Sequence, residues 1–205
     1  MIKMRNEELS KFLEGYKQEV TSIYGEAGTG KTTLCLLATL ELALSGKKVI
    51  FFDTESNFSI ERINQILEGK NKECLKNILK LKINNFNVQH TQIKNLENIK
   101  NISLIVVDSL THHYRRLYSK EPELAKGMLA KQLLILKNIA KNIPVIITSQ
   151  VYSGFENNIM PVGRDVLIGL SDTLIKLEKN PRKIIMKKPE NKEIKFEIVN
   201  EGIKI

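Results

Sequence analysis

Three short runs of the chain are apolar at every position, at residues 49–52, 104–107 and 145–147. Such runs are typical of strands that helices cover on both faces, because a strand with one solvated face alternates between apolar and polar residues. Residues 20–24 have the β-branched content of a further short strand. Together these segments predict an α/β fold with a mostly parallel central sheet flanked by helices.

Apolar residues at helical spacing lie between these strands. Residues 34–44 predict a largely buried helix, and residues 58–67 predict another with one apolar face. A longer helix is expected to begin at Pro122 and to run to Asn142. Its apolar face is formed by Leu129, Leu133, Leu136 and Ala140.

The first residues form a separate amphipathic segment. Leu9, Phe12 and Leu13 lie at helical spacing, so we expect a short helix there. We therefore predict a short N-terminal helical lead-in at residues 1–19 and one core domain at residues 20–205.

Two regions have a weaker pattern. Within a stretch rich in Asn and Lys, residues 73–75 and 89–99 look helical and residues 78–83 alternate like a strand. Residues 151–165 contain two glycines and a proline with little periodicity, which predicts a mobile loop.

The last part of the chain predicts three strands, at residues 173–177, 183–187 and 194–199. The second and third are expected to form an antiparallel hairpin closed by residues 189–192.

Composition narrows the class of protein. Of the 205 residues, 42% are hydrophobic and 27% are charged, which is typical of a soluble globular domain. No apolar run is long enough to span a bilayer and no signal-peptide pattern is present, so we expect no membrane partner and a cytoplasmic location. The two cysteines, Cys35 and Cys74, lack the spacing of a metal site.

The formal net charge is +9. A surface with this charge attracts polyanions such as nucleic acid. Lys, Ile and Asn are also plentiful in chains encoded by AT-rich genomes, so composition alone is an alternative source of the charge.

Residues 24–33 contain the pattern G-x-x-x-x-G-K-[ST] between a predicted strand and a predicted helix. The glycines allow backbone N–H groups to surround phosphate oxygens, and the helix dipole favours the same anion. Lys31 is expected to reach the β- and γ-phosphates, and the Thr32 hydroxyl is expected to bind Mg²⁺. The predicted nucleotide-binding residues are Gly25, Glu26, Ala27, Gly28, Thr29, Gly30, Lys31, Thr32 and Thr33.

Asp108 ends the apolar run 104–107. A P-loop nucleotidase needs a carboxylate at this place to hold Mg²⁺, so we assign Asp108, with Thr32, to the metal. The polar residues 148–150 end the next buried run, and Gln150 is placed to act near the γ-phosphate.

Residues 112–120 are basic and aromatic. Arg can bind phosphate and Tyr can stack on a base, which predicts a nucleic-acid contact, although a solvated loop has the same composition. The adjacent His112 and His113 have no partner at metal spacing.

The order of these motifs resembles that of the RecA/RadA recombinase superfamily. The motifs are the P-loop, residues 53–55, residues 104–109 and residues 147–151, and residues 58–62 look like the family's F-x-x-E-R segment. The resemblance runs from about Val20 to the last residue, and implies a RecA-like P-loop ATPase core with a C-terminal antiparallel hairpin. This chain is similar to an archaeal paralogue of the recombinases that is short, basic and consists of the ATPase core alone.

The resemblance implies a role for each matching residue. Glu55 falls where the family keeps the carboxylate that activates water, and Gln150 where it keeps the γ-phosphate sensor; with Lys31 they are the expected catalytic residues. Arg62 would stack on adenine. ATP and Mg²⁺ are the implied cofactors. DNA, single-stranded by preference, is expected at residues 115–121 and 151–165, through Arg115, Arg116, Lys120 and Arg164.

Several features depart from the full recombinases. We expect no N-terminal helical DNA-binding domain, no polymerisation motif and no acidic cap near residues 187–189, and Glu121 would repel phosphate. These differences predict a weak ATPase without strand exchange of its own. It would assist the main recombinase or a Holliday-junction nuclease in DNA recombination and repair. The sequence is compatible with either a monomer or a homo-oligomer. Two alternatives stay open: a DNA-dependent ATPase acting in filaments, and a RecA-fold signalling ATPase that does not bind DNA.

Overall fold

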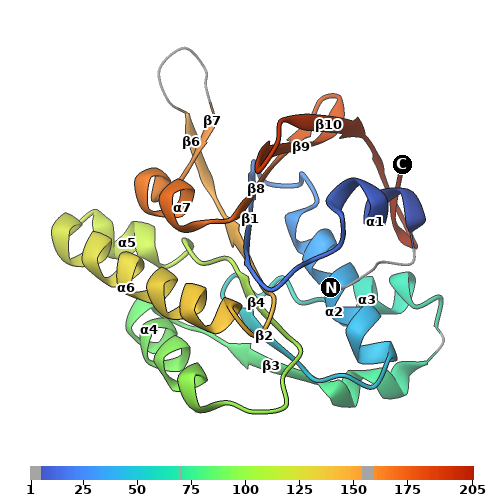
Figure 1. Cartoon of the computed structure of the whole chain (residues 1–205), viewed down its shortest axis with the longest axis horizontal. Helices are drawn as coiled ribbons and strands as arrows, with labels where there is room; N and C mark the ends of the chain where they lie inside the picture. Colours follow the sequence, from blue (N-terminus) through green and yellow to red (C-terminus); the bar gives the residue numbers. More distant parts are fainter. Residues whose placement is uncertain (1–5, 70, 154–158) are drawn as a thin grey trace.

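The computed structural model describes residues 6–69, 71–153 and 159–205. Its centre is an eight-stranded sheet with the strand order β10-β9-β8-β1-β5-β4-β2-β3 (Figure 1). The six strands from β8 to β3 in that order are parallel, and β9 and β10 are antiparallel to their neighbours. The strands are β1 (Val20–Gly25), β2 (Val49–Asp53), β3 (Ile78–Lys82), β4 (Leu104–Asp108), β5 (Val145–Ser149), β8 (Thr173–Lys179), β9 (Arg182–Lys188) and β10 (Lys192–Lys195).

Helices cover both faces of this sheet (Figure 1). On one side lie α1 (Glu7–Leu13), α2 (Lys31–Leu44), α3 (Ile60–Ile66) and the 3-10 helix η1 (Lys72–Asn77). On the other side lie α4 (Phe86–Asn95), the 3-10 helix η2 (Leu96–Asn98), α5 (Tyr114–Tyr118), α6 (Pro122–Ala140) and α7 (Arg164–Leu170).

The two helical layers explain the apolar runs in the sequence. Successive side chains of a strand point to opposite faces. In β2, Phe51 packs into the core beneath α2, whereas Ile50 and Phe52 pack into the core beneath α4 and α6. In β4, Val106 and Val107 divide in the same way. Both faces of each strand are therefore buried from solvent. The predicted parallel sheet is confirmed.

Two small antiparallel sheets stand outside the main one. β6 (Val151–Ser153) pairs with β7 (Ile159–Pro161), and β11 (Glu197–Val199) pairs with β12 (Gly202–Lys204). The prediction of a loop over 151–165 was therefore wrong at its two ends, and residues 154–158 of that prediction lie outside the described residues. The predicted strand 194–199 is divided, because Phe196 turns into the core between β10 and β11.

Two helix predictions also need correction. The helix expected at 89–99 begins at Phe86, since the Asn85 side chain accepts a hydrogen bond from the Val88 N–H and caps it. Most of the predicted DNA loop 115–121 is the short helix α5, which ends at Tyr118. The predicted C-terminal hairpin is confirmed as β9 and β10.

Candidate functional site

The P-loop connects β1 to α2. Gly28 and Gly30 have φ angles of 75° and 104°, which favour glycine, and Gly30 is the N-cap of α2. A Cβ atom at Gly30 would lie 3.1 Å from Ile198 Cδ1, so that site is also tight. The Lys31 ammonium donates to the carbonyls of Gly25 and Glu26, each at 2.8 Å, and so lies against the loop.

Lys31 is a poorly solvated cation. Burial lowers the pKa of its ammonium, and the nearby carboxylates of Asp108 and Glu55 act in the opposite direction. A loop of positive-φ glycines at a helix N-terminus beside a buried cation has the chemistry of a phosphate site.

Asp108 and Thr32 meet at the carboxyl ends of the strands. The Thr32 hydroxyl donates to Asp108 Oδ2 at 2.7 Å, and the Thr148 hydroxyl donates to Oδ1. Burial raises the pKa of the Asp108 carboxyl, although both hydroxyl contacts act to lower it. A carboxylate and a hydroxyl side by side next to a phosphate loop fit the oxygen preference of Mg²⁺. Thr148, on the strand end beside Asp108, adds a positioning contact that sequence reasoning left unassigned.

Glu55 and Gln150 are in direct contact, although 95 positions separate them in the chain. Gln150 Nε2 donates to Glu55 Oε1 at 3.0 Å, and His112 Nδ1 lies 3.3 Å from the same amide nitrogen. Arg115 Nη1 donates to Gln150 Oε1 at 3.3 Å. Gln150 therefore joins the carboxylate beside the P-loop to a basic side chain of α5. His112 was not assigned to this cluster from the sequence. Its position four residues after Asp108, near the end of the same strand, could have indicated that it lies at this site.

Arg62 lies at the edge of the P-loop region. Its guanidinium donates to the carbonyls of Val199 at 2.8 Å and of Gly202 at 3.3 Å, and so holds the β11–β12 sheet. Ile198 of that sheet packs near Gly30. The adenine contact of Arg62 stays a prediction.

The turn between β8 and β9 also touches the P-loop. Arg182 Nη1 donates to the Gly28 carbonyl at 2.9 Å, and Lys179 Nζ lies 2.9 Å from the Glu26 carboxylate. Sequence reasoning missed both residues, because they lie about 150 positions from the loop they touch and carry no motif.

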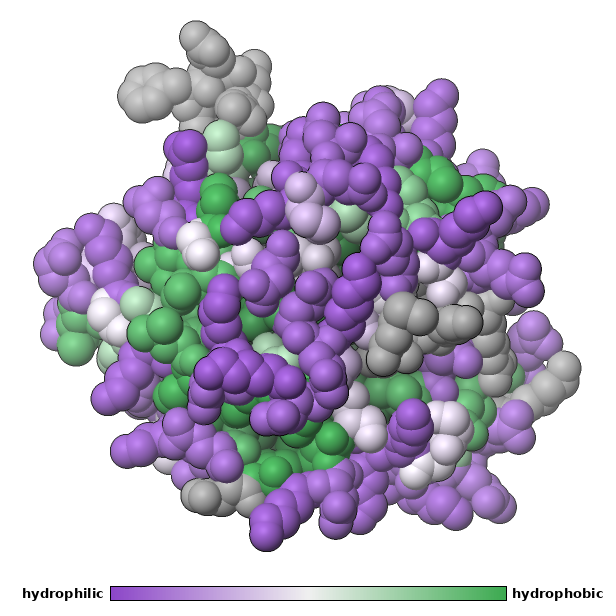
Figure 2. Space-filling model, in the orientation of Figure 1, coloured by the Kyte–Doolittle hydropathy of each residue, from purple (hydrophilic) through white to green (hydrophobic). Residues whose placement is uncertain are grey.

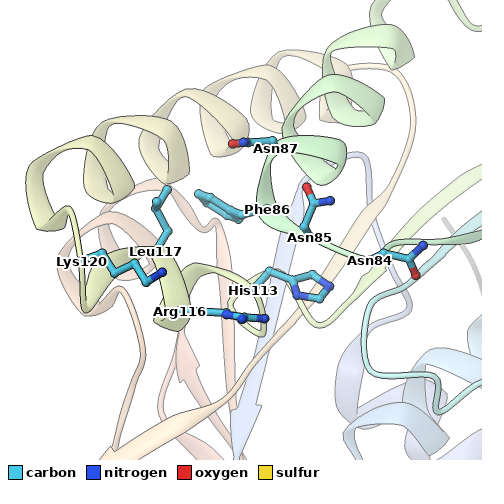
Figure 3. Close-up of a pocket in the computed structure, with 8 residues that line it drawn as sticks. All are labelled: Asn84, Asn85, Phe86, Asn87, His113, Arg116, Leu117 and Lys120. Carbon is cyan, nitrogen blue, oxygen red and sulfur yellow. The ribbon is translucent and has the colours of Figure 1, made fainter.

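The four predicted DNA-binding residues divide between two grooves on either side of α5. Arg115 and Arg164 line a groove of about 640 Å³, which we call the tyrosine groove. Arg116 and Lys120 line a second groove of about 310 Å³, which we call the asparagine groove (Figure 3). The tyrosine groove is lined by Tyr114, Arg115, Tyr118, Lys126, Tyr152, Val162, Gly163, Arg164, Asp165 and Val166.

The tyrosine groove combines aromatic and basic side chains. Tyr118 and Tyr152 are 40% and 44% exposed, which leaves ring surface open for stacking. Burial raises the pKa of Tyr114 to about 12, so its hydroxyl stays protonated at neutral pH. Lys126 lies 5.9 Å from the centre of the Tyr118 ring. Tyr152 lies within the predicted DNA loop 151–165 but was not named among its contacts, because no motif marks it.

In the part of the chain that the structure describes, no helix combines the length and apolarity needed to cross a membrane. Hydrophilic residues cover most of the face shown in Figure 2. Among the same residues, no cluster of three or more His, Cys, Asp or Glu side chains could hold a metal.

Fold and site define a RecA-like P-loop domain, with the P-loop after β1, the acid at the end of β4 and the glutamine after β5. The chain belongs to the Rad51 family, whose profile matches residues 1–204.

Several of its relatives carry the same name. The DNA repair and recombination protein RadB of Methanococcus maripaludis strain C5 is 37% identical over 200 residues, which cover 92% of each chain. RadB of Methanocaldococcus jannaschii is 38% identical over 201 residues, covering 91% of this chain and 92% of the relative. The crystal structure of the RadB recombinase superposes with a TM-score of 0.83 at 32% identity, covering 99% of this chain and 98% of that one. The resemblance to a short archaeal paralogue is thereby confirmed.

Proposed function

We propose that this protein binds ATP and DNA as an accessory of homologous recombination and DNA repair, with weak ATPase activity and no strand exchange of its own. The names of its relatives support the process, since they are DNA repair and recombination proteins. The observation that carries the proposal is Gln150, whose amide touches Glu55 on one side and Arg115 on the other. The two ends of that contact belong to the P-loop region and to the tyrosine groove.

ATP phosphates would lie in the P-loop against Lys31, and Thr32 and Asp108 would hold Mg²⁺. The cation would neutralise charge on the phosphates. Glu55 would accept a proton from the attacking water, a task that needs a carboxylate within one water of the phosphate. Gln150 donates to Glu55 Oε1, and Asn57 Nδ2 donates to Oε2 at 3.3 Å, so both contacts orient the carboxylate.

DNA would occupy the tyrosine groove, with bases stacked on Tyr118 and Tyr152 and phosphates near Arg115 and Arg164. A nucleotide that withdraws Gln150 from Arg115 would change that cation's position in the groove. Nucleotide state therefore sets DNA affinity in this proposal, and the main recombinase or a Holliday-junction nuclease would be the protein that receives the bound DNA.

The test is single-stranded DNA affinity across a salt series without nucleotide, with ADP and with ATP. We expect salt-sensitive binding that depends on the nucleotide, because phosphate contacts release counterions. Lys31→Ala should lose the nucleotide effect and keep basal DNA binding. Lys141→Ala, at an exposed position just after α6, is the control for charge alone.

Two other outcomes would reject the proposal. Absence of DNA binding in every nucleotide state would favour a signalling ATPase. Rapid ATP turnover stimulated by DNA, together with filaments, would favour a recombinase.

A further inference from the structure

The asparagine groove lies on the opposite side of α5 from the tyrosine groove. Figure 3 shows the residues that line the asparagine groove. One wall is the connection from β3 into α4, which supplies three asparagines, two before Phe86 and one after it. The other wall is α5 and the turn after it. The groove is lined by Asn84, Asn85, Phe86, Asn87, His113, Arg116, Leu117 and Lys120.

The lining is positively charged. None of its eight residues is acidic, and Arg116 and Lys120 are both exposed. His113 is held in place, because its Nε2 lies 2.9 Å from the Ile83 carbonyl, and burial lowers the pKa of the ring. The neutral imidazole therefore donates to that carbonyl, and the charge of the groove comes from Arg116 and Lys120. Such a groove selects an anion.

The remaining surface suits a nucleotide. Asn84 and Asn87 are exposed and carry both a donor and an acceptor, as a base edge requires. Asn85 is already used, since its oxygen caps α4. The half-buried Leu117 supplies apolar surface for the face of a base or a ribose, whereas Phe86 is buried (Figure 3). The groove has a volume of about 310 Å³, which leaves room for one nucleotide unit.

Helix α5 separates the two grooves, and the buried rings of Phe86 and Tyr114 pack together next to it. Phe86 of the asparagine groove meets Tyr114 of the tyrosine groove edge-on, with ring centres 6.0 Å apart. Tyr114 in turn lies 5.3 Å from Tyr118. Since adjacent phosphates of one strand in B-DNA are about 3.4 Å apart along the axis, a few nucleotides would span α5.

The consecutive residues Arg115 and Arg116 line one groove each. Tyr118 and Tyr152 in the tyrosine groove are exposed for base stacking. These accessible groups favour nucleic acid over an acidic peptide as the occupant.

We propose that the asparagine groove binds one further nucleotide of the same single DNA strand that occupies the tyrosine groove. Arg116 and Lys120 bind its phosphate, and Asn84 and Asn87 contact the edge of its base. The inference rests on the proposed DNA-binding function and extends the DNA footprint to residues 84–87, outside both predicted DNA loops.

The test compares two double variants on oligothymidylates of increasing length. Asn87→Ala/Lys120→Ala removes one amide and one charge from the groove. Asn138→Ala/Lys141→Ala removes the same groups from exposed positions at the end of α6, and is the matched control. Circular dichroism and melting temperature check that both variants fold.

We expect both variants to bind the shortest oligomers, which fill only the tyrosine groove, like the wild type. On long oligomers the groove variant should lose roughly tenfold in affinity and about one unit of salt slope, while the control is unchanged. Equal affinity of the two variants for long oligomers would overturn the inference. If the wild type itself does not bind the short oligomers, the proposed function would instead be rejected.

Poly-L-glutamate is the second probe, and separates nucleic acid from acidic protein. Weaker poly-L-glutamate binding by the groove variant, with unchanged DNA binding, would assign the groove to an acidic peptide and overturn the inference. DNA binding that falls while poly-L-glutamate binding stays the same supports it.

Discussion

The Gln150 side chain has three polar partners, which come from two distant segments of the chain. Its amide nitrogen contacts Glu55 and His112, and its amide oxygen accepts from Arg115. An amide can serve in this way because it carries donors and an acceptor at once. A change in what binds Glu55 would therefore alter the orientation of an amide whose oxygen accepts from Arg115 of the tyrosine groove.

Glu55→Gln tests the catalytic side of this contact. The variant keeps the size of the side chain but has no carboxylate to accept a proton, so we expect ATP hydrolysis to fall by about 100-fold or more. ATP affinity should stay within a few-fold of the wild type, since Lys31 and Thr32 are untouched. ATP turnover and ATP affinity are measured on the same preparations of variant and wild type. Undiminished turnover in the variant would show that Glu55 is not the catalytic base.

His113→Gln tests a pH effect on stability. Burial holds the pKa of His113 below its ordinary value of 6.5, so the unfolded chain takes up the proton first as the pH falls. The stabilisation of the folded state that arises from the lowered pKa of His113 is fully present above pH 6.5 and is lost as the pH falls through the folded-state pKa.

Glutamine keeps a donor for the Ile83 carbonyl but does not titrate. Between about pH 7.5 and about pH 5.5, we expect the variant's melting temperature to fall less than that of the wild type. His90, whose pKa burial also lowers, should leave a residual slope. Identical slopes would show that His113 has no such effect.

At the scale of elements, the parts that could be predicted are those with a local pattern. The P-loop was found because its residues are adjacent in sequence, and β2 and β4 were found because both of their faces are buried. Helix α5 was not found, since five residues are too few to show a helical period. The division of 194–199 at Phe196 depends on a core that only the folded chain creates.

The β8–β9 turn is an element whose role could not be predicted, because its contacts with the P-loop are non-local. Arg182→Gln should remove the charged donor from the Gly28 carbonyl and leave the loop less ordered. We expect ATP to bind roughly five- to tenfold more weakly, as for the loss of a hydrogen bond worth about 1 kcal/mol. Titration with a fluorescent ATP analogue measures this, with Lys187→Ala as the control on the exposed side of β9. Unchanged affinity would mean that the turn does not order the loop.

On the scale of the whole molecule, nucleotide and DNA would bind at the same edge of the sheet. If ATP changes DNA affinity by some factor, DNA must change ATP affinity by the same factor. We expect a coupling within the usual range of about 5- to 150-fold, carried by Gln150.

Gln150→Ala should reduce this coupling toward one while each ligand still binds alone. The measurement is the ATP dissociation constant with and without saturating single-stranded DNA, for wild type and variant. Coupling of undiminished size in the variant would show that another route joins the two sites.

The position of β1 in the sheet also governs when the nucleotide site can form. β1 lies between β5 and β8, with Val20 opposite Val145 and Thr21 opposite Thr173. Both partner strands come from the last third of the chain, so a ribosome must release most of the protein before the P-loop strand has any neighbour. Such long-range pairing slows folding. ATP bound at the P-loop would therefore stabilise only a chain in which β1 has already paired with β5 and β8, and would not stabilise a chain that still lacks those strands.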